Sequence, residues 1–155
     1  MGHLVAILIA SAPSEAPTSV AEVYAVPGRG LTGDRYFESR GTFSPMPMKP
    51  DHEVTLIEQE NLEAFARTAD QPYTAAQARR NLVTAGVRLN DLVHCEFVVG
   101  SVRLRGMRLC EPCAHLARIS VAEVLPGLVH RGGLRAQILT AGMIHVGDRV
   151  ENGSP

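Results

Sequence analysis

Two cysteines three positions apart form the chain's most distinctive chemical pattern. Cys110 and Cys113 enclose Glu111 and Pro112, and His115 follows two positions later. Thiolate sulfur is a metal ligand and a nucleophile, and imidazole is a metal ligand and a proton carrier. This spacing therefore allows a metal clip, a dithiol redox pair, a single working thiolate or two buried small side chains.

Each of these alternatives has its own requirement. A structural zinc site needs four ligands, usually from two separated pairs, and here Cys110, Cys113 and His115 have only His130 to complete them. A redox pair of this spacing normally opens a helix in a β-α-β unit, and the sequence predicts no such unit. Free cysteine is most often a small buried residue, and we predict that Cys95, alone in the strand-like sequence VHCEF, lies in the core. The remaining alternative is that one cysteine is the thiolate ligand of a cofactor metal.

Charged residues beside glycines form three further candidate segments. The planar fork of arginine suits phosphate and other oxyanions, and glycine lets backbone N–H groups approach an anion closely. One such segment is usually an exposed turn, but three of them together with the cysteine pair favour a site. The segments hold Asp34 and Arg35 after a glycine turn, Arg79 and Arg80 before a predicted strand, and Arg131 and Arg135 around Gly132 and Gly133.

Four stretches of sequence, in this order, carry a resemblance to a known family. They read GLTGDR, ARRNLVTAGVRLNDL, GMRLCEPCAHL and HRGGLRAQILTAGMIHVGD. They resemble the MOSC family, which comprises stand-alone or fused domains similar to the C-terminal part of molybdenum-cofactor sulfurases. The resemblance covers about residues 28 to 150. It implies a β-barrel-like fold, molybdenum-cofactor or sulfur chemistry, and one characteristic cysteine after a strand.

The resemblance also implies roles for individual residues. The characteristic cysteine directly follows or lies close to a proline in several branches, so it maps best onto Cys113, which follows Pro112. In the enzymatic members, which reduce N-hydroxylated compounds, this thiolate is a molybdenum ligand and arginines hold the pterin phosphate. Cys110, a feature of the small-protein branch, and His115, a candidate for proton delivery, complete the catalytic set. The cofactor-binding candidates are Asp34, Arg35, Arg79, Arg80, Asn81, Arg131, Gly132, Gly133 and Arg135.

Four candidates, among them His130 as a second histidine for proton delivery, have a structural alternative. Asn81 either hydrogen-bonds the pterin edge or serves as a turn amide at the start of a strand. Asp34 either binds the cofactor or has a structural role, in which it pairs with Arg35 or caps a turn, and we favour the structural role. A histidine such as His115 or His130 is more often structural than catalytic.

Three hypotheses for the function follow. The leading one is a molybdenum-cofactor-binding oxidoreductase that acts on small N–O or similarly reducible compounds. It needs an external electron-donor protein, because the chain has one C-x-x-C pair and no cysteine cluster for an iron–sulfur centre. The second is a sulfur carrier that holds a persulfide on Cys113 for a metal or small-molecule acceptor. The third is a non-catalytic cofactor-binding module.

The composition sets the class of protein. The 155 residues, 45% of them hydrophobic, suffice for a single domain with its own core, residues 1–155. The net charge of -1 gives no general attraction to nucleic acid. The longest apolar run, Leu4 to Ala10, is too short to cross a membrane, and an odd number of cysteines argues for a reducing compartment. We therefore expect a soluble cytoplasmic protein.

Short strands and glycine turns dominate the predicted elements. Three helices are predicted. The first covers 58–69, the second is short and begins at a capping box of Thr74 and Gln77, and the third runs from Ser120 to Leu125. Strands are predicted at 4–10, 20–26, 53–57, 81–87 with a turn at Gly86, 96–106 with a turn or bulge at Gly100, and 134–150 as a hairpin. This pattern predicts a mainly β fold: a closed or nearly closed antiparallel β-barrel with a few short peripheral helices.

Two expectations concern the layout of the site. Arginines from distant segments, Arg79 or Arg80 and Arg131 or Arg135, should converge near Cys113, because an anionic phosphate needs more than one fork. The long loop 27–50, rich in glycine and proline and carrying apolar side chains, should wall the cleft that contains this cysteine.

Overall fold

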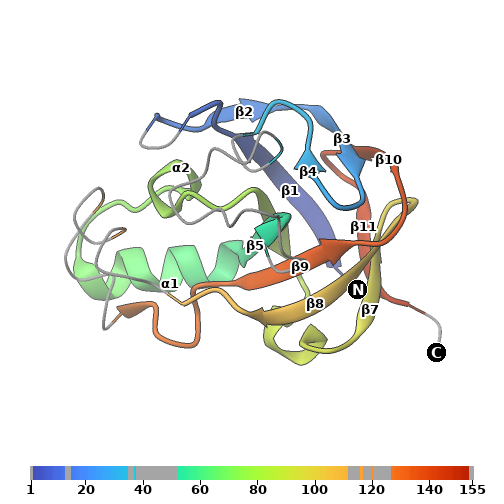
Figure 1. Ribbon diagram of the computed structural model, residues 1–155. Coiled ribbons are helices and arrows are strands. Elements are labelled where there is room, and N and C mark those ends of the chain that lie inside the picture. The colour runs from blue at the N-terminus through green and yellow to red at the C-terminus, as the bar shows by residue number, and fades with distance from the viewer. Residues whose placement is uncertain are drawn as a thin grey trace.

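Seven strands close into a barrel in the computed structural model of the protein, which describes residues 2–12, 15–34, 37, 52–111, 116, 120 and 127–153. The pairing of β11 with β1 completes the ring (Figure 1). Among the pairs of this ring, only β5 and β6 run parallel. The fold class predicted from the sequence is thus confirmed. In order around the ring the strands are β1 (Gly2–Ile9), β6 (Leu82–Ala85), β5 (Val54–Glu58), β9 (Leu134–Ile138), β8 (Val102–Leu109), β7 (Glu96–Val99) and β11 (Arg149–Asn152).

Alternating side chains fill the inside of the barrel. On β8, Val102 and Leu104 are buried while Arg105 is exposed, as the period of two requires. The 3-10 helix η2 (Leu89–Leu92) adds Leu89 and Leu92 to the same core. Closure leaves no free edge between the ring strands, which is the usual solution for a sheet built from short strands.

A β-α-β connection joins the two parallel strands. The chain leaves β5 through α1 (Gln59–Ala69) and α2 (Ala75–Ala78) and returns as β6. The apolar side of α1 packs on the outer face of β5 and β6, where Phe65 and Tyr73 meet edge to face at 4.9 Å. The capping box of Thr74 and Gln77 is present as predicted. The sequence did not reveal this β-α-β unit, and the unit does not contain the cysteine pair.

The predicted hairpin over 134–150 is wrong. The strand β10 (Gly142–His145) pairs with β3 (Glu22–Val26), and β4 (Gly30–Leu31) completes this small second sheet. Because β9 already pairs with β5 on one side and β8 on the other, it has no edge left for β10. The predicted strand 20–26 is likewise split, since β2 (Thr18–Val20) pairs with β1 and only β3 enters the second sheet.

The prediction that Cys95 is a core residue is also wrong. Cys95 is exposed and lies in a turn between η2 and β7, where His94 adopts the left-handed conformation (φ 65°). A continuous strand would have buried Cys95 on the same side as Phe97. The turn at His94 breaks this alternation, so Cys95 is exposed.

Other expectations fall mostly outside the described residues. Of the loop 27–50, the structure describes 27–34 and Phe37, and of the predicted helix from Ser120 to Leu125 it describes Ser120 alone. No helix among the described residues is long and apolar enough to span a membrane.

Candidate functional site

Cys110 begins the cysteine loop, the segment from Cys110 to Cys113. It directly follows β8 and is buried, with a relative exposure of 2%. Its N–H donates to the carbonyl of Gly133 at 2.8 Å, and its own carbonyl accepts from Nη2 of Arg80 at 3.1 Å. Both backbone groups are therefore held. The predicted catalytic residues Cys113 and His115 lie outside the described residues, so their roles stay predictions.

Arg80 brings three distant segments together. Its side chain is buried, and each of its three nitrogens donates to a carbonyl: Nε to Gly132 at 2.8 Å, Nη1 to Ala78 at 3.0 Å and Nη2 to Cys110 at 3.1 Å. The segments holding Arg80, Gly132 and Cys110 therefore meet at the end of β8. Whether these segments also meet Cys113 is outside the described residues.

The neighbouring Arg79 points elsewhere. It ends α2 in the left-handed conformation (φ 58°), which turns the chain so that Arg79 and Arg80 leave in different directions. Its Nη1 donates to the carbonyl of Glu15 at 2.7 Å. Of this arginine pair, Arg80 is the one that reaches the cysteine loop in the contacts described.

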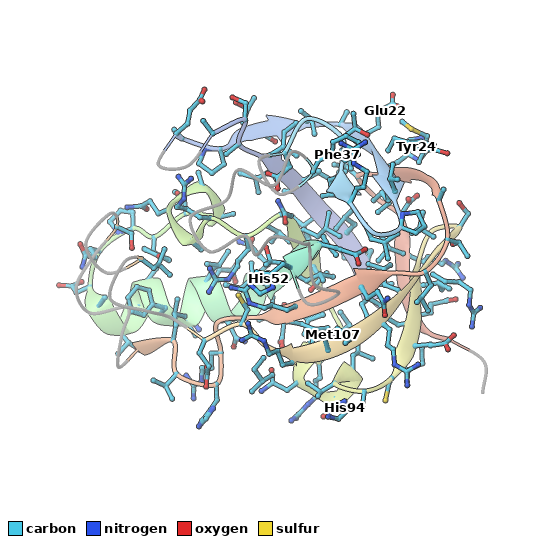
Figure 2. All side chains as sticks on the ribbon, viewed as in Figure 1. Glu22, Tyr24, Phe37, His52, His94 and Met107 are labelled. Atoms are coloured by element: carbon cyan, nitrogen blue, oxygen red, sulfur yellow. The ribbon has the colours of Figure 1, made fainter. Side chains whose placement is uncertain are left out.

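A β-bulge places two arginines side by side on the outside of the barrel. The register of β8 against β9 shifts between Gly106 and Arg108, which leaves Met107 as the extra residue (labelled in Figure 2) and sets Arg108 opposite Arg135. Without the bulge, the period of two would turn Arg108 toward the core. Arg108 was not among the candidate cofactor-binding residues, because a shift in register leaves no local signal.

Arg135 carries unsatisfied donors. Its Nε and Nη1 are buried and have no hydrogen-bond partner in the part of the chain that the structure describes. Like charges directly opposite each other on neighbouring strands are destabilising, and buried unpaired N–H groups add a further cost of roughly 1–3 kcal/mol. Arg135 therefore keeps two costly buried donors close to the start of the cysteine loop, opposite Arg108 on β8.

The backbone conformation explains why one of the two glycines before β9, Gly133, is required. Gly133 has φ 108°, and a Cβ on it would overlap the carbonyl oxygen of Leu56 on β5. Glycine is thus required because the turn passes directly over the β5 backbone. The carbonyls of Gly132 and Gly133 are taken by Arg80 and Cys110, and a role of their N–H groups in binding an anion stays a prediction.

His130 binds Glu111, the residue that follows Cys110 in the cysteine loop. The carboxylate of Glu111 accepts from the backbone N–H of His130 at 2.7 Å and lies 2.9 Å from its Nδ1.

Beside this contact is an open polar hollow of about 320 Å³. Its walls include Arg131 and Glu58, and burial is the main cause that raises the pKa of Glu58 above its ordinary value. Arg131 therefore lines this hollow and has no described contact with Arg135.

Asn81 and Asp34 are engaged in the framework of the barrel. The Asn81 amide oxygen accepts from the N–H of Thr55 at 3.0 Å, and its Nδ2 donates to the carbonyl of Leu8 at 3.2 Å. The carboxylate of Asp34 accepts from the N–H of Ala10 at 3.0 Å and so ties the turn after β4 to the end of β1. A cofactor contact of Asn81 stays a prediction, and Arg35 lies outside the described residues.

Known proteins share this architecture and part of its sequence. A family profile for the MOSC domain matches residues 44–151, well over half of the chain. The chain belongs to the MOSC domain family. This family is associated with molybdenum-cofactor binding. No curated protein matches the sequence.

Solved structures agree with this MOSC domain at the level of the fold. The crystal structure of the YUAD protein from Bacillus subtilis has a TM-score of 0.82 at 15% identity, over 98% of this chain and 96% of that one. YiiM from Geobacillus stearothermophilus has a TM-score of 0.77 at 15% identity, over 99% of this chain and 76% of that one. YiiM from Escherichia coli has a TM-score of 0.70 at 17% identity, over 100% and 71%. Identities this low show a shared fold alone.

Proposed function

We propose that this MOSC domain binds a molybdenum cofactor at the end of β8 and works as an oxidoreductase on small N–O or similarly reducible compounds. Membership of the family supports cofactor binding. The observation that carries the proposal is Arg135, whose buried Nε and Nη1 have no hydrogen-bond partner. A protein keeps such donors at a net cost unless a ligand satisfies them.

The ligand that fits these donors is a phosphate. Arginine forks bind phosphate oxygens in pairs, and two guanidinium groups on neighbouring strands offset two negative charges. Arg108 and Arg135 are set opposite each other, so both can reach one anion on the outer face of the barrel. The pterin of a molybdenum cofactor carries a phosphate, so the residues present fit this group.

The chain's own residues divide the remaining tasks. Arg135 and Arg108 hold the phosphate, and the thiolate of Cys113 is the protein's ligand to the metal, since molybdenum in a dithiolene site accepts soft sulfur ligands. Burial of Cys110 and the hydrogen bonds on its backbone keep the entrance of the cysteine loop in place. When bound, the molybdenum supplies the two-electron redox chemistry that reduction of an N–O bond requires.

The electrons come from a separate donor protein. An iron–sulfur cluster generally takes four cysteine ligands, whereas the whole chain has three cysteines. One of these is Cys95, which is exposed in the turn between η2 and β7. We therefore include an electron-donor protein, together with the small-molecule substrate, among the partners of this domain.

Metal and pterin analysis of purified protein tests the proposal. The chain is produced in a host that makes molybdenum cofactor, and we expect about one molybdenum and one pterin per chain in the wild type, as a single site with one thiolate ligand requires. Arg135→Gln should retain less than about a tenth of both, because it loses the charged fork. Arg67→Gln, an exposed arginine on α1 with the same charge change, is the matched control and should retain the full amount.

Other metal and sulfur contents would reject the proposal. A cyanide-labile sulfur on Cys113 without molybdenum would identify a persulfide carrier instead, because a persulfide releases its outer sulfur to cyanide. Protein with neither molybdenum nor labile sulfur would be a non-catalytic module. Equal retention by Arg135→Gln and the wild type would remove Arg135 from the site.

A further inference from the structure

Arg80 has a bonding pattern that differs from that of an anion ligand. All three of its nitrogens already donate to backbone carbonyls, whereas two nitrogens of Arg135 have no partner. Guanidinium groups that bind anions generally present a free fork to them. A charged side chain that is 8% exposed and bonded in this way instead joins pieces of backbone.

Two of the three carbonyls lie at the end of the pairing of β8 with β9, where the Cys110 N–H also donates to Gly133, and the third lies in α2. Ala78 lies in the four-residue helix α2, Gly132 lies in the turn before β9, and Cys110 follows β8. The planar geometry of arginine fixes the relative positions of all three, because its five N–H donors point in set directions. A lysine has a single nitrogen on a flexible stem and cannot replace this bridge.

We propose that Arg80 is the positioning residue of the cysteine loop: by holding the Cys110 carbonyl against the 132–133 turn, it fixes the point from which the chain continues to Cys113. This inference rests on the proposed function in so far as Cys113 is the working residue. It replaces the role of phosphate ligand that the sequence suggested for Arg80.

The hold on Cys110 extends to Cys113 through a short stretch of chain. Cys110 is fixed at both backbone groups, and Glu111 is tied to the backbone and ring of His130. Pro112 then has a restricted φ. Since consecutive Cα atoms are about 3.8 Å apart, the Cα of Cys113 lies within roughly 11 Å of the Cα of Cys110. Loss of the Arg80 hydrogen bond would leave the start of the loop to the Cys110 N–H and to Glu111, and would weaken this anchor.

Amide hydrogen exchange in the cofactor-free chain tests the anchor. In Arg80→Lys we expect the Cys110 amide to exchange about tenfold faster or more, because two of the three charged hydrogen bonds are lost. The exchange rates of amides in β5 and β6 should increase only as much as the loss of global stability, measured by urea unfolding, accounts for. Arg103→Lys is the matched control: it weakens a side-chain contact to Glu96 on β7 and should leave the Cys110 amide unchanged.

Chemical rescue and thiol labelling connect the anchor with Cys113. In Arg80→Ala, low-millimolar guanidinium chloride should restore slow exchange at Cys110, while equimolar ammonium chloride should not. Alkylation of Cys113, followed by peptide mass spectrometry at one pH, should proceed in folded Arg80→Lys at a rate closer to that of the unfolded chain than in the folded wild type. In the folded wild type, this rate should differ from that of the unfolded chain severalfold.

Three results would overturn the inference. They are an unchanged Cys110 amide in Arg80→Lys, an equal acceleration of all barrel amides, and a Cys113 labelling rate that Arg80→Lys leaves at the wild-type value. These measurements use no molybdenum, so they stand apart from the metal determination. A chain that binds no molybdenum can still show the anchor, and a molybdenum-binding chain can lack it.

Discussion

At the scale of single residues, buried polar side chains act as braces between segments. Glu53 is 2% exposed, and one of its carboxylate oxygens, Oε1, accepts from the N–H groups of Gly28 and Ile138, each at 3.1 Å. Burial raises the pKa of Glu53 above 4.5, and the two backbone hydrogen bonds oppose this shift. A carboxyl with a raised pKa binds its proton more tightly in the folded chain. Its contribution to stability is therefore full below pH 4.5 and is lost as the pH rises through the folded pKa.

Glu53→Gln should make stability less dependent on pH. Glutamine keeps the oxygen that accepts both hydrogen bonds but cannot ionise, so we expect a free energy of unfolding at pH 7 equal to or above that of the wild type. Glu53→Ala leaves both N–H groups unsatisfied and should cost about 1–3 kcal/mol for each. Urea unfolding from pH 4.5 to pH 7 measures both variants. A glutamine variant as unstable as the alanine variant would show that the charge itself is needed.

Asn81 should prove to be a structural residue. Asn81→Ala removes the acceptor of the Thr55 N–H and the donor to the Leu8 carbonyl, both buried between β5 and β1. We expect a loss of about 2–4 kcal/mol in the free energy of unfolding. In protein that remains folded at low temperature, molybdenum content should stay near the wild-type value. A stable variant that loses only the cofactor would instead support the pterin contact.

At the scale of elements, close approach between backbones decides which residues the turns accept. Gly133 crosses the β5 backbone with φ 108°, and its carbonyl receives the N–H of Cys110. The β8 bulge has the same character, because a Cβ on Gly106 would overlap the carbonyl of Leu92. Gly133 directly precedes β9 and Gly106 lies within β8, the strand that leads into the cysteine loop, so the shape of the site depends on both.

Gly133→Ala should destabilise the domain far more than Gly147→Ala. Both positions have a positive φ, 108° and 97°, so both variants bear a strain of about 1–2 kcal/mol. At Gly147 the added methyl group meets open space, whereas at Gly133 it overlaps Leu56. We expect a difference of at least about 2 kcal/mol between them by chemical denaturation. Equal losses would mean that β5 can shift to accept the methyl group.

At the scale of the whole molecule, the two ends of the described chain hold the barrel shut. β1 pairs with β11 through Gly2 with Val150 and His3 with Arg149, and the Leu4 N–H donates to the Asp148 carbonyl at 2.8 Å. Val150 is buried in the barrel core. Closure therefore depends on residues that are far apart in sequence, which favours a cooperative unfolding transition.

A chain that ends after Asp148 should lose cooperative unfolding. It lacks β11, so β1 and β7 both gain an unpaired edge and the barrel core opens. We expect a broad thermal transition and strong binding of the dye ANS. A chain that ends after Asn152 keeps β11 and should unfold within a few degrees of the wild type. Cooperative unfolding of the shorter chain would show that the barrel does not need closure.

The sequence by itself determined the elements whose signals are local. Alternating residues predict β8, the pair of Thr74 and Gln77 predicts the start of α2, and glycine marks the turns at Gly86 and Gly100. The order of four motifs indicated the family, and many short strands indicated a closed β-barrel. These inferences hold because each depends on neighbouring residues or on the general need to bury strand edges.

Only the tertiary structure decided how these elements pair. β10 joins β3 because β9 has partners on both sides, Cys95 is exposed because a left-handed turn precedes β7, and Arg108 faces outward because of a bulge. Which arginine is an anchor and which has free donors likewise depends on carbonyls in distant segments of the chain. A shift of one residue in register exchanges the two faces of a strand, and that shift is set by contacts between distant segments.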